Sequence, residues 1–111
     1  ELSLMDNVRE LALEQARLHG ATRIDAITLR VGVLAGVEPN ALRFAFEVVM
    51  AGSIAASAEL HVEAVAAEAF CEPCRKPFAV RDGVCECPRC GAISRRLLRG
   101  RELELASLEL A

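Results

Sequence analysis

Residues 70–91 read FCEPCRKPFAVRDGVCECPRCG, and this stretch decides how the chain is organised. It contains two Cys-x-x-Cys pairs, Cys71 with Cys74 and Cys87 with Cys90, with twelve residues between them. Each pair predicts a tight turn that brings two sulfurs together, and two facing turns supply four thiolates in a tetrahedron. The spacing therefore predicts a metal site of four sulfurs, a donor set that suits Zn²⁺.

Three interpretations of these cysteines compete: structural zinc, a redox-active dithiol and an iron site. A lobe of this size cannot bury enough apolar surface to stabilise itself. Structural zinc supplies about 10–16 kcal/mol in small domains, against about 2–4 kcal/mol for a disulfide. Neither pair is followed by the helical pattern of a thioredoxin-like motif. We expect a closed structural zinc site, which leaves no coordination position for a substrate, with these ligands: Cys71, Cys74, Cys87 and Cys90.

The fifth cysteine, Cys85, is surplus to this site. The short Cys85-Glu-Cys87 spacing would allow Cys85 to replace Cys87, whereas the Cys-Pro-x-Cys-Gly turn favours Cys87 and Cys90. Gly91 follows that turn and permits the positive φ that such turns need. Three basic residues lie close in sequence and would offset the negative charge of the four thiolates: Arg75, Lys76 and Arg89.

Outside the cysteine stretch, apolar periodicity predicts two helices and three strands. The expected helices cover 1–19 and 39–51, and the expected strands cover 23–34, 58–65 and 101–111. Two neighbouring apolar stripes share one face of the first helix: Leu4, Val8 and Leu11 in one, and Met5, Ala12 and Ala16 in the other. Gly20 predicts a left-handed end to that helix. Pro39, directly after Glu38, predicts the first residue of the second helix.

The last strand carries apolar residues that a cysteine lobe cannot use, so we expect the chain to leave the main domain, build the lobe and return to complete the sheet. The predicted fold class is α+β, a small three-stranded sheet with two helices and an inserted zinc-ribbon lobe. The α+β domain is expected to be discontinuous, over 1–66 and 101–111, with the lobe over 67–100.

Composition argues against several classes of function. The 111 residues include 13 Lys and Arg against 16 Asp and Glu, no Trp or Tyr and four Phe, which disfavours binding of nucleic acid. No apolar run reaches the length of a membrane span, and no signal peptide is visible, so we expect a cytoplasmic protein without a membrane partner. No phosphate-binding loop and no set of catalytic residues stands out, so we do not expect an enzyme.

Taken together, these segments resemble the HypA/HybF family of hydrogenase-maturation nickel chaperones over nearly the whole chain. Besides the paired cysteines, four segments carry the resemblance: residues 1–8 (ELSLMDNV), 29–39 (LRVGVLAGVEP), 42–48 (LRFAFEV) and 102–109 (ELELASLE). The opening and closing segments are more distinctive than the cysteines alone.

The resemblance implies a nickel metallochaperone with a structural zinc site and a separate site for its Ni²⁺ cargo. It implies delivery of Ni²⁺ to the large-subunit precursor of NiFe hydrogenase, together with a nickel-handling, HypB-like GTPase. In this family a Met-His pair directly ahead of a glutamate builds the nickel site. The present sequence begins at that glutamate, so we expect either that two preceding residues are missing from it or that the nickel site is damaged. Two residues carry over as neighbours of the nickel site: Glu1 and Glu38.

Two other functions are consistent with the cysteine pattern. One is a zinc-ribbon module that binds a protein or a nucleic acid, which the acidic composition disfavours. The other is a thiol oxidoreductase that uses one Cys-x-x-Cys pair. The sequence leaves open whether the chain forms a homodimer and whether urease is also served.

Overall fold

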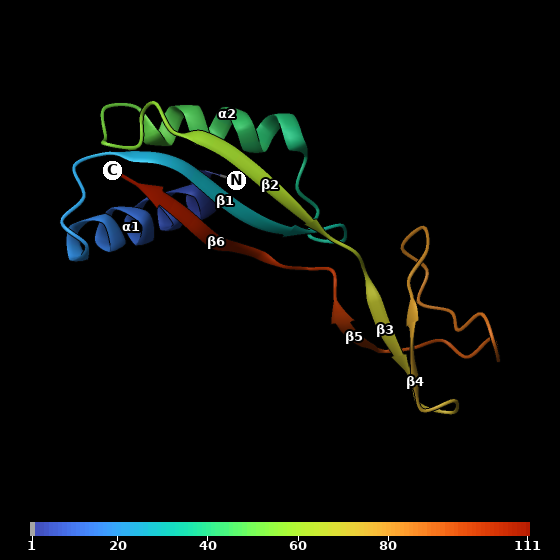
Figure 1. Ribbon diagram of the computed structural model, residues 1–111. Helices are drawn as coiled ribbons and strands as arrows, with labels where there is room; N and C mark the ends of the chain where they lie inside the picture. Colours follow the sequence, from blue (N-terminus) through green and yellow to red (C-terminus); the bar gives the residue numbers. More distant parts are fainter. Residues whose placement is uncertain (1) are drawn as a thin grey trace. The chain divides into compact units, whose positions relative to one another are not determined.

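A computed structural model describes residues 2–111, so the predicted contribution of Glu1 lies outside the described residues. The elements, in chain order, are α1 (Leu2–Leu18), β1 (Ile24–Gly32), α2 (Pro39–Met50), β2 (Glu59–Val65), β3 (Glu68–Cys71), β4 (Lys76–Ala79), β5 (Arg96–Arg99) and β6 (Leu103–Leu110) (Figure 1). None of the described helices has the length and apolar character that a membrane crossing requires.

The chain forms two compact units, each assembled from separate segments. The first comprises the chain up to Arg30, Val37–Glu63 and Glu104–Ala111, and the second comprises Val31–Gly36 and Ala64–Leu103. The first unit contains both helices and most of a sheet with the order β2-β1-β6 (Figure 1). The last strand thus returns to pair with β1, and the predicted α+β class is confirmed.

The core of the first unit lies between the helices and the central strand. From β1 it takes Ile24, Ala26, Ile27 and Leu29, and from α2 it takes Leu42, Ala45, Phe46 and Met50. Strand β2 is an edge strand, and its predicted inward residue Val62 is 42% exposed. An edge strand has a neighbour on one side only, so its apolar residues are less completely covered.

Helix α1 buries a narrower face than its sequence predicts. Met5, Val8, Ala12 and Ala16 are buried, whereas Leu4 and Leu11 are 44% and 56% exposed. The prediction that both apolar stripes face the core is therefore wrong for the stripe of Leu4 and Leu11. Alanines at two of the buried positions allow the helix backbone to approach its neighbours closely, and this turns the larger leucines outward.

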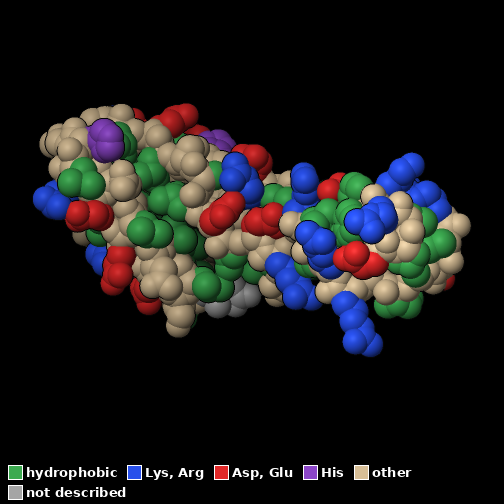
Figure 2. Space-filling model, turned by 90° about the horizontal axis from the view of Figure 1, so that it is seen from below, with side chains coloured by type: hydrophobic (Ala, Val, Ile, Leu, Met, Phe, Trp, Pro, Cys, Tyr) green, Lys and Arg blue, Asp and Glu red, His purple; other side chains and the backbone are tan. Residues whose placement is uncertain are grey.

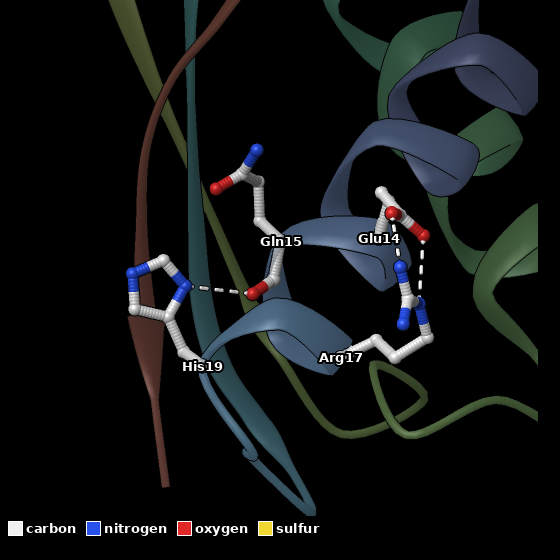
Figure 3. Close-up of polar contacts among 4 residues, drawn as sticks. All are labelled: Glu14, Gln15, Arg17 and His19. Atoms are coloured by element: carbon white, nitrogen blue, oxygen red, sulfur yellow. Dashed lines mark hydrogen bonds and ion pairs between the residues drawn. The ribbon is translucent and has the colours of Figure 1, made fainter.

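The C-terminus of α1 is closed by a Schellman motif. Gly20 adopts a φ of 66°, its N–H donates to the Arg17 carbonyl over 3.2 Å, and the Ala21 N–H donates to the Ala16 carbonyl over 2.9 Å. The Nδ1 of His19 lies 2.8 Å from the Gln15 carbonyl, while Arg17 pairs with Glu14 (Figure 3). Since a carbonyl only accepts, Nδ1 carries the proton, and His19 satisfies the end of the helix.

The second unit contains a small sheet with the order β4-β3-β5, in which both pairs are antiparallel. Strands β3 and β4 form a hairpin whose closing pair is Cys71 with Lys76. The sequence pattern did not predict these strands, because each has only four residues and contains too little alternation to be recognised.

Candidate metal centre

The hairpin and the loop that follows it place four cysteines together. Cys71 ends β3, Cys74 lies in the turn before β4, and Cys87 and Cys90 lie in the connection between β4 and β5. Their sulfurs all lie within 4.8 Å of one another. Within residues 2–111, this is the one group of three or more potential metal-ligating Cys, His, Asp or Glu side chains.

The spacing of the sulfurs fits a tetrahedral ion. The Sγ atoms of Cys71 and Cys90 are 3.5 Å apart, and those of Cys74 and Cys87 are 4.0 Å apart. Zn–S bonds of about 2.3 Å in a tetrahedron place the sulfurs about 3.8 Å from one another, between these two values. A disulfide would require about 2.05 Å, and all five cysteines are free thiols.

Backbone N–H groups of each turn point at the first sulfur of its pair. Burial raises the pKa of the Cys87 thiol, but N–H groups of Cys90 and Arg89 donate to its sulfur, and with neighbouring thiols they lower the pKa to about 6. The Cys74 N–H donates to the Cys71 sulfur and lowers its pKa, which burial and the other thiols then raise to about 12. These N–H groups stabilise thiolates, the form of cysteine that binds metal.

Each Cys-x-x-Cys turn is followed by a residue with a positive φ, but only the second turn has a glycine at that position. Gly91, which follows the second pair, has a φ of 77°, and its N–H donates to the Cys87 carbonyl over 2.8 Å. Arg75, which follows the first pair, has a φ of 54° although it is not glycine. The positive φ predicted at Gly91 is confirmed, and the equivalent geometry at Arg75 had no signal in the sequence.

Arg89 is the predicted cation that the structure brings to the sulfurs. It donates a hydrogen bond to the Cys74 sulfur, and this bond, with the nearby thiolates, raises the pKa of its guanidinium. It also donates to the Pro77 carbonyl over 3.2 Å, which fixes it across the hairpin. The other two predicted cations, Arg75 and Lys76, have exposed side chains.

The sulfur cluster is part of the small core of the second unit. Cys71 and Cys87 are buried together with Ala69 and Phe78. Cys85 is not a member of the cluster, and its carbonyl accepts a hydrogen bond from the Ser94 N–H over 2.8 Å. Such a small core needs a crosslink, and a metal ion on four sulfurs would supply it.

The carboxylate of Glu38, predicted to neighbour a nickel site, caps helix α2. Its two oxygens accept the N–H groups of Asn40 over 3.0 Å and Ala41 over 2.8 Å. Pro39 follows as the first helical residue, as predicted. The described residues place no second metal-ligating cluster around Glu38.

Comparison with known proteins covers the whole chain. Residues 1–110 match the family described as "Hydrogenase/urease nickel incorporation, metallochaperone, hypA". Hydrogenase maturation factor HypA of Picosynechococcus is 40% identical over 110 residues, which are 99% of this chain and 97% of the relative. The HypA of Rhizobium leguminosarum bv. viciae shows the same identity and coverage.

Solved structures share the fold. The solution structure of the nickel metallochaperone HypA from Helicobacter pylori matches with a TM-score of 0.75 and 23% identity, over 99% of this chain and 96% of that one. A second solution structure of a HypA protein matches with a TM-score of 0.76 and 23% identity, over 98% of this chain and 93% of that one.

Proposed function

The chain belongs to the HypA family of nickel-incorporation metallochaperones, which act in hydrogenase maturation, and we propose that its two units handle two different ions. In this proposal a zinc-ribbon lobe over residues 67–100, which lies within the second unit, holds a permanent Zn²⁺. The proposed α+β domain, residues 1–66 and 101–111, contains the first unit and carries Ni²⁺ as cargo. The observation that carries this division is the four-sulfur cluster, which leaves no position open for exchange.

Zinc fits the four cysteines better than nickel does. Cys71, Cys74, Cys87 and Cys90 would hold the ion, and zinc would supply a crosslink between the β3–β4 turn and the following loop. Ni²⁺ favours square-planar or tetragonal sites with nitrogen and oxygen ligands. Such ligands are available at a chain end, where an amine, amide nitrogens and an imidazole can surround the ion.

The nickel site in this proposal lies at the start of the chain, with Glu1 and Glu38 as neighbours. The N–H groups of Asn40 and Ala41 already hold both oxygens of Glu38. A carboxylate fixed in this way is oriented before an ion arrives, and each oxygen keeps a lone pair for it. A site near a terminus also allows ligands to exchange with an acceptor, as transfer of cargo requires.

The proposed acceptor is the large-subunit precursor of NiFe hydrogenase, and the proposed partner is a HypB-like GTPase in the cytoplasm. The loop between β1 and α2, Gly32-Val-Leu-Ala-Gly36, lacks the Lys-Ser/Thr ending of a phosphate-binding loop. Nucleotide hydrolysis would therefore have to come from a partner. A reducing compartment also keeps the metal-binding thiols available.

Nickel titration of zinc-loaded protein tests this function. The chain, extended by the Met-His pair expected ahead of Glu1, is titrated with Ni²⁺ and monitored by calorimetry, with a variant carrying Met-Ala as the matched control. We expect close to one equivalent of nickel per chain, no loss of zinc, and weaker binding as the pH falls. Absence of nickel binding to the Met-His chain would refute the proposal.

One observation favours an interaction role for the second unit as a second candidate function. Its residues include eight Lys and Arg against five Asp and Glu, although the whole chain is acidic. Figure 2 shows these basic side chains gathered over that unit. Binding to a nucleic acid that weakens steeply with salt would support this alternative.

A further inference from the structure

The second cysteine pair lies on a small hairpin between β4 and β5, which we call the connection hairpin (residues 85–94). The Cys87 N–H donates to the Ala92 carbonyl over 2.9 Å, and the Ser94 N–H donates to the Cys85 carbonyl over 2.8 Å. These bonds make the connection hairpin one structured piece that carries both cysteines of the second pair. Its position against the β3–β4 hairpin therefore decides whether the four sulfurs meet.

Two hydrogen bonds fasten the connection hairpin to the β3–β4 hairpin. The Ser94 hydroxyl donates to the Phe70 carbonyl over 2.5 Å, and the Arg89 guanidinium donates to the Pro77 carbonyl over 3.2 Å. Phe70 and Pro77 lie directly opposite each other in the pairing of β3 with β4. The two bonds therefore hold one cross-strand pair from both of its strands, and that pair lies next to Cys71.

The Ser94 hydroxyl acts as both donor and acceptor. A hydroxyl has one hydrogen, which goes to the Phe70 carbonyl, and its oxygen accepts the Arg96 N–H over 3.1 Å. The Arg96 guanidinium lies over the Phe70 ring, 5.0 Å from its centroid. Strands β3 and β5 and the connection hairpin thus meet at this one hydroxyl, and an alanine at this position would leave two backbone groups without it as a partner.

We propose that Ser94 and Arg89 are positioning residues that hold the two cysteine turns opposite each other and so set how tightly the four sulfurs retain zinc. This inference rests on the proposed zinc site. The bonds to Phe70 and Pro77 end on carbonyl oxygens, so the ion contributes nothing to them. Because they restrict how the two turns can move, less conformational freedom is lost when the ion binds.

The zinc affinity of the full chain, measured by competition with a chromophoric chelator, tests this inference. Ser94→Ala should bind zinc about two- to tenfold more weakly than wild type, the range expected for one lost hydrogen bond. Ser94→Thr keeps the hydroxyl and should restore most of the affinity. The matched control is Ser107→Ala, at an exposed serine on β6, which should bind zinc like the wild type.

Cobalt spectroscopy distinguishes a positioning role from loss of the site itself. Co²⁺-loaded Ser94→Ala should keep the sulfur-to-metal charge-transfer band of four thiolates, because no ligand has been removed. Arg89→Gln gives a second variant, and Arg81→Gln, at an exposed arginine of the same unit, is its control. Of these two, we expect weaker zinc binding in Arg89→Gln only.

Three results would overturn the inference and leave the zinc site in place. They are wild-type zinc affinity in Ser94→Ala, a Ser94→Thr variant as weak as Ser94→Ala, and loss of the cobalt band in Ser94→Ala. A wild-type chain that holds no zinc would be a different result, because it would overturn the proposed function and this inference with it.

Discussion

The backbone of Gly100 occupies the space that a side chain on Gly32 would need. A β-carbon on Gly32 would lie 2.1 Å from both the carbonyl carbon and the carbonyl oxygen of Gly100. Hydrogen bonds hold this approach on both sides: the Gly32 N–H donates to the Glu102 carbonyl, and the Leu34 N–H donates to the Gly100 carbonyl, each over 2.7 Å. The two segments of the second unit therefore meet where only a hydrogen atom fits.

Gly32→Ala should lower the free energy of unfolding. Overpacking typically costs about 1–3 kcal/mol, and we expect a loss at least this large. The methyl group would meet backbone, which cannot move aside as a side chain can. Urea unfolding of the zinc-loaded protein measures the loss. Gly36→Ala is the control, since no atom lies within 4 Å of its β-carbon position and only its positive φ opposes the change. Equal losses in the two variants would contradict the account.

Gly91→Ala should weaken the second cysteine turn. Gly91 has a φ of 77°, and a side chain in this left-handed region costs about 1–2 kcal/mol. Arg75→Gly, at the equivalent position of the first turn, should stabilise that turn. Arg75 already has a positive φ, and glycine adopts this conformation without the cost that a side chain brings. Competition with a chromophoric zinc chelator measures both, and we expect faster zinc loss from Gly91→Ala and slower loss from Arg75→Gly.

Cys85→Ser should leave the zinc content unchanged, because the Cys85 sulfur lies outside the cluster. Cys71→Ser and Cys87→Ser should each lose zinc, since serine offers no thiolate. Elemental analysis of the purified variants settles the ligand set. A loss of zinc in Cys85→Ser, with full retention in Cys87→Ser, would mean that Cys85 is the ligand.

Glu102 should make stability depend on pH. The Gly100 N–H donates to its Oε1 over 2.7 Å, and this bond is the main cause that lowers the pKa of the carboxyl group. Because the folded pKa lies below the unfolded one, the stabilisation is present above the unfolded pKa and is lost as the pH falls through the folded pKa. Glu102→Gln should therefore be less stable than wild type at neutral pH.

The difference in the free energy of unfolding between Glu102→Gln and wild type should shrink as the pH is lowered through the acidic range. Urea unfolding at each pH measures it. Glu109→Gln is the matched control, because Glu109 is an exposed carboxylate on β6, the strand that begins directly after Glu102. A gap that stays constant with pH would show that the hydrogen bond contributes nothing through ionisation.

The longer elements could be predicted from the sequence because each repeats a pattern several times. The two helices, the three strands of the first sheet and the return of β6 to β1 follow from alternation, from Gly20 and from Pro39. The buried face of α1 could not be predicted, since the pattern gives Leu4 and Met5 equal weight and packing selects Met5. Strands β3 to β5 are too short to show a period.

The cysteine cluster could be predicted because its spacing restricts the geometry to two facing turns. The N–H groups that donate to the sulfurs, and the left-handed backbone of Arg75, depend on how the turns close. For Glu38, Pro39 predicted where helix α2 begins. The hydrogen bonds by which the Glu38 carboxylate caps the helix could be seen only in the structure. The assignment of nickel ligands stays a prediction.

X-ray absorption at the zinc and nickel edges of protein loaded with both ions tests the division of the two metals most directly. The chain carrying Met-His ahead of Glu1 should show four sulfur neighbours around zinc at about 2.3 Å, and only nitrogen and oxygen around nickel. Sulfur in the nickel shell, or a zinc shell with fewer than four sulfurs, would contradict the account.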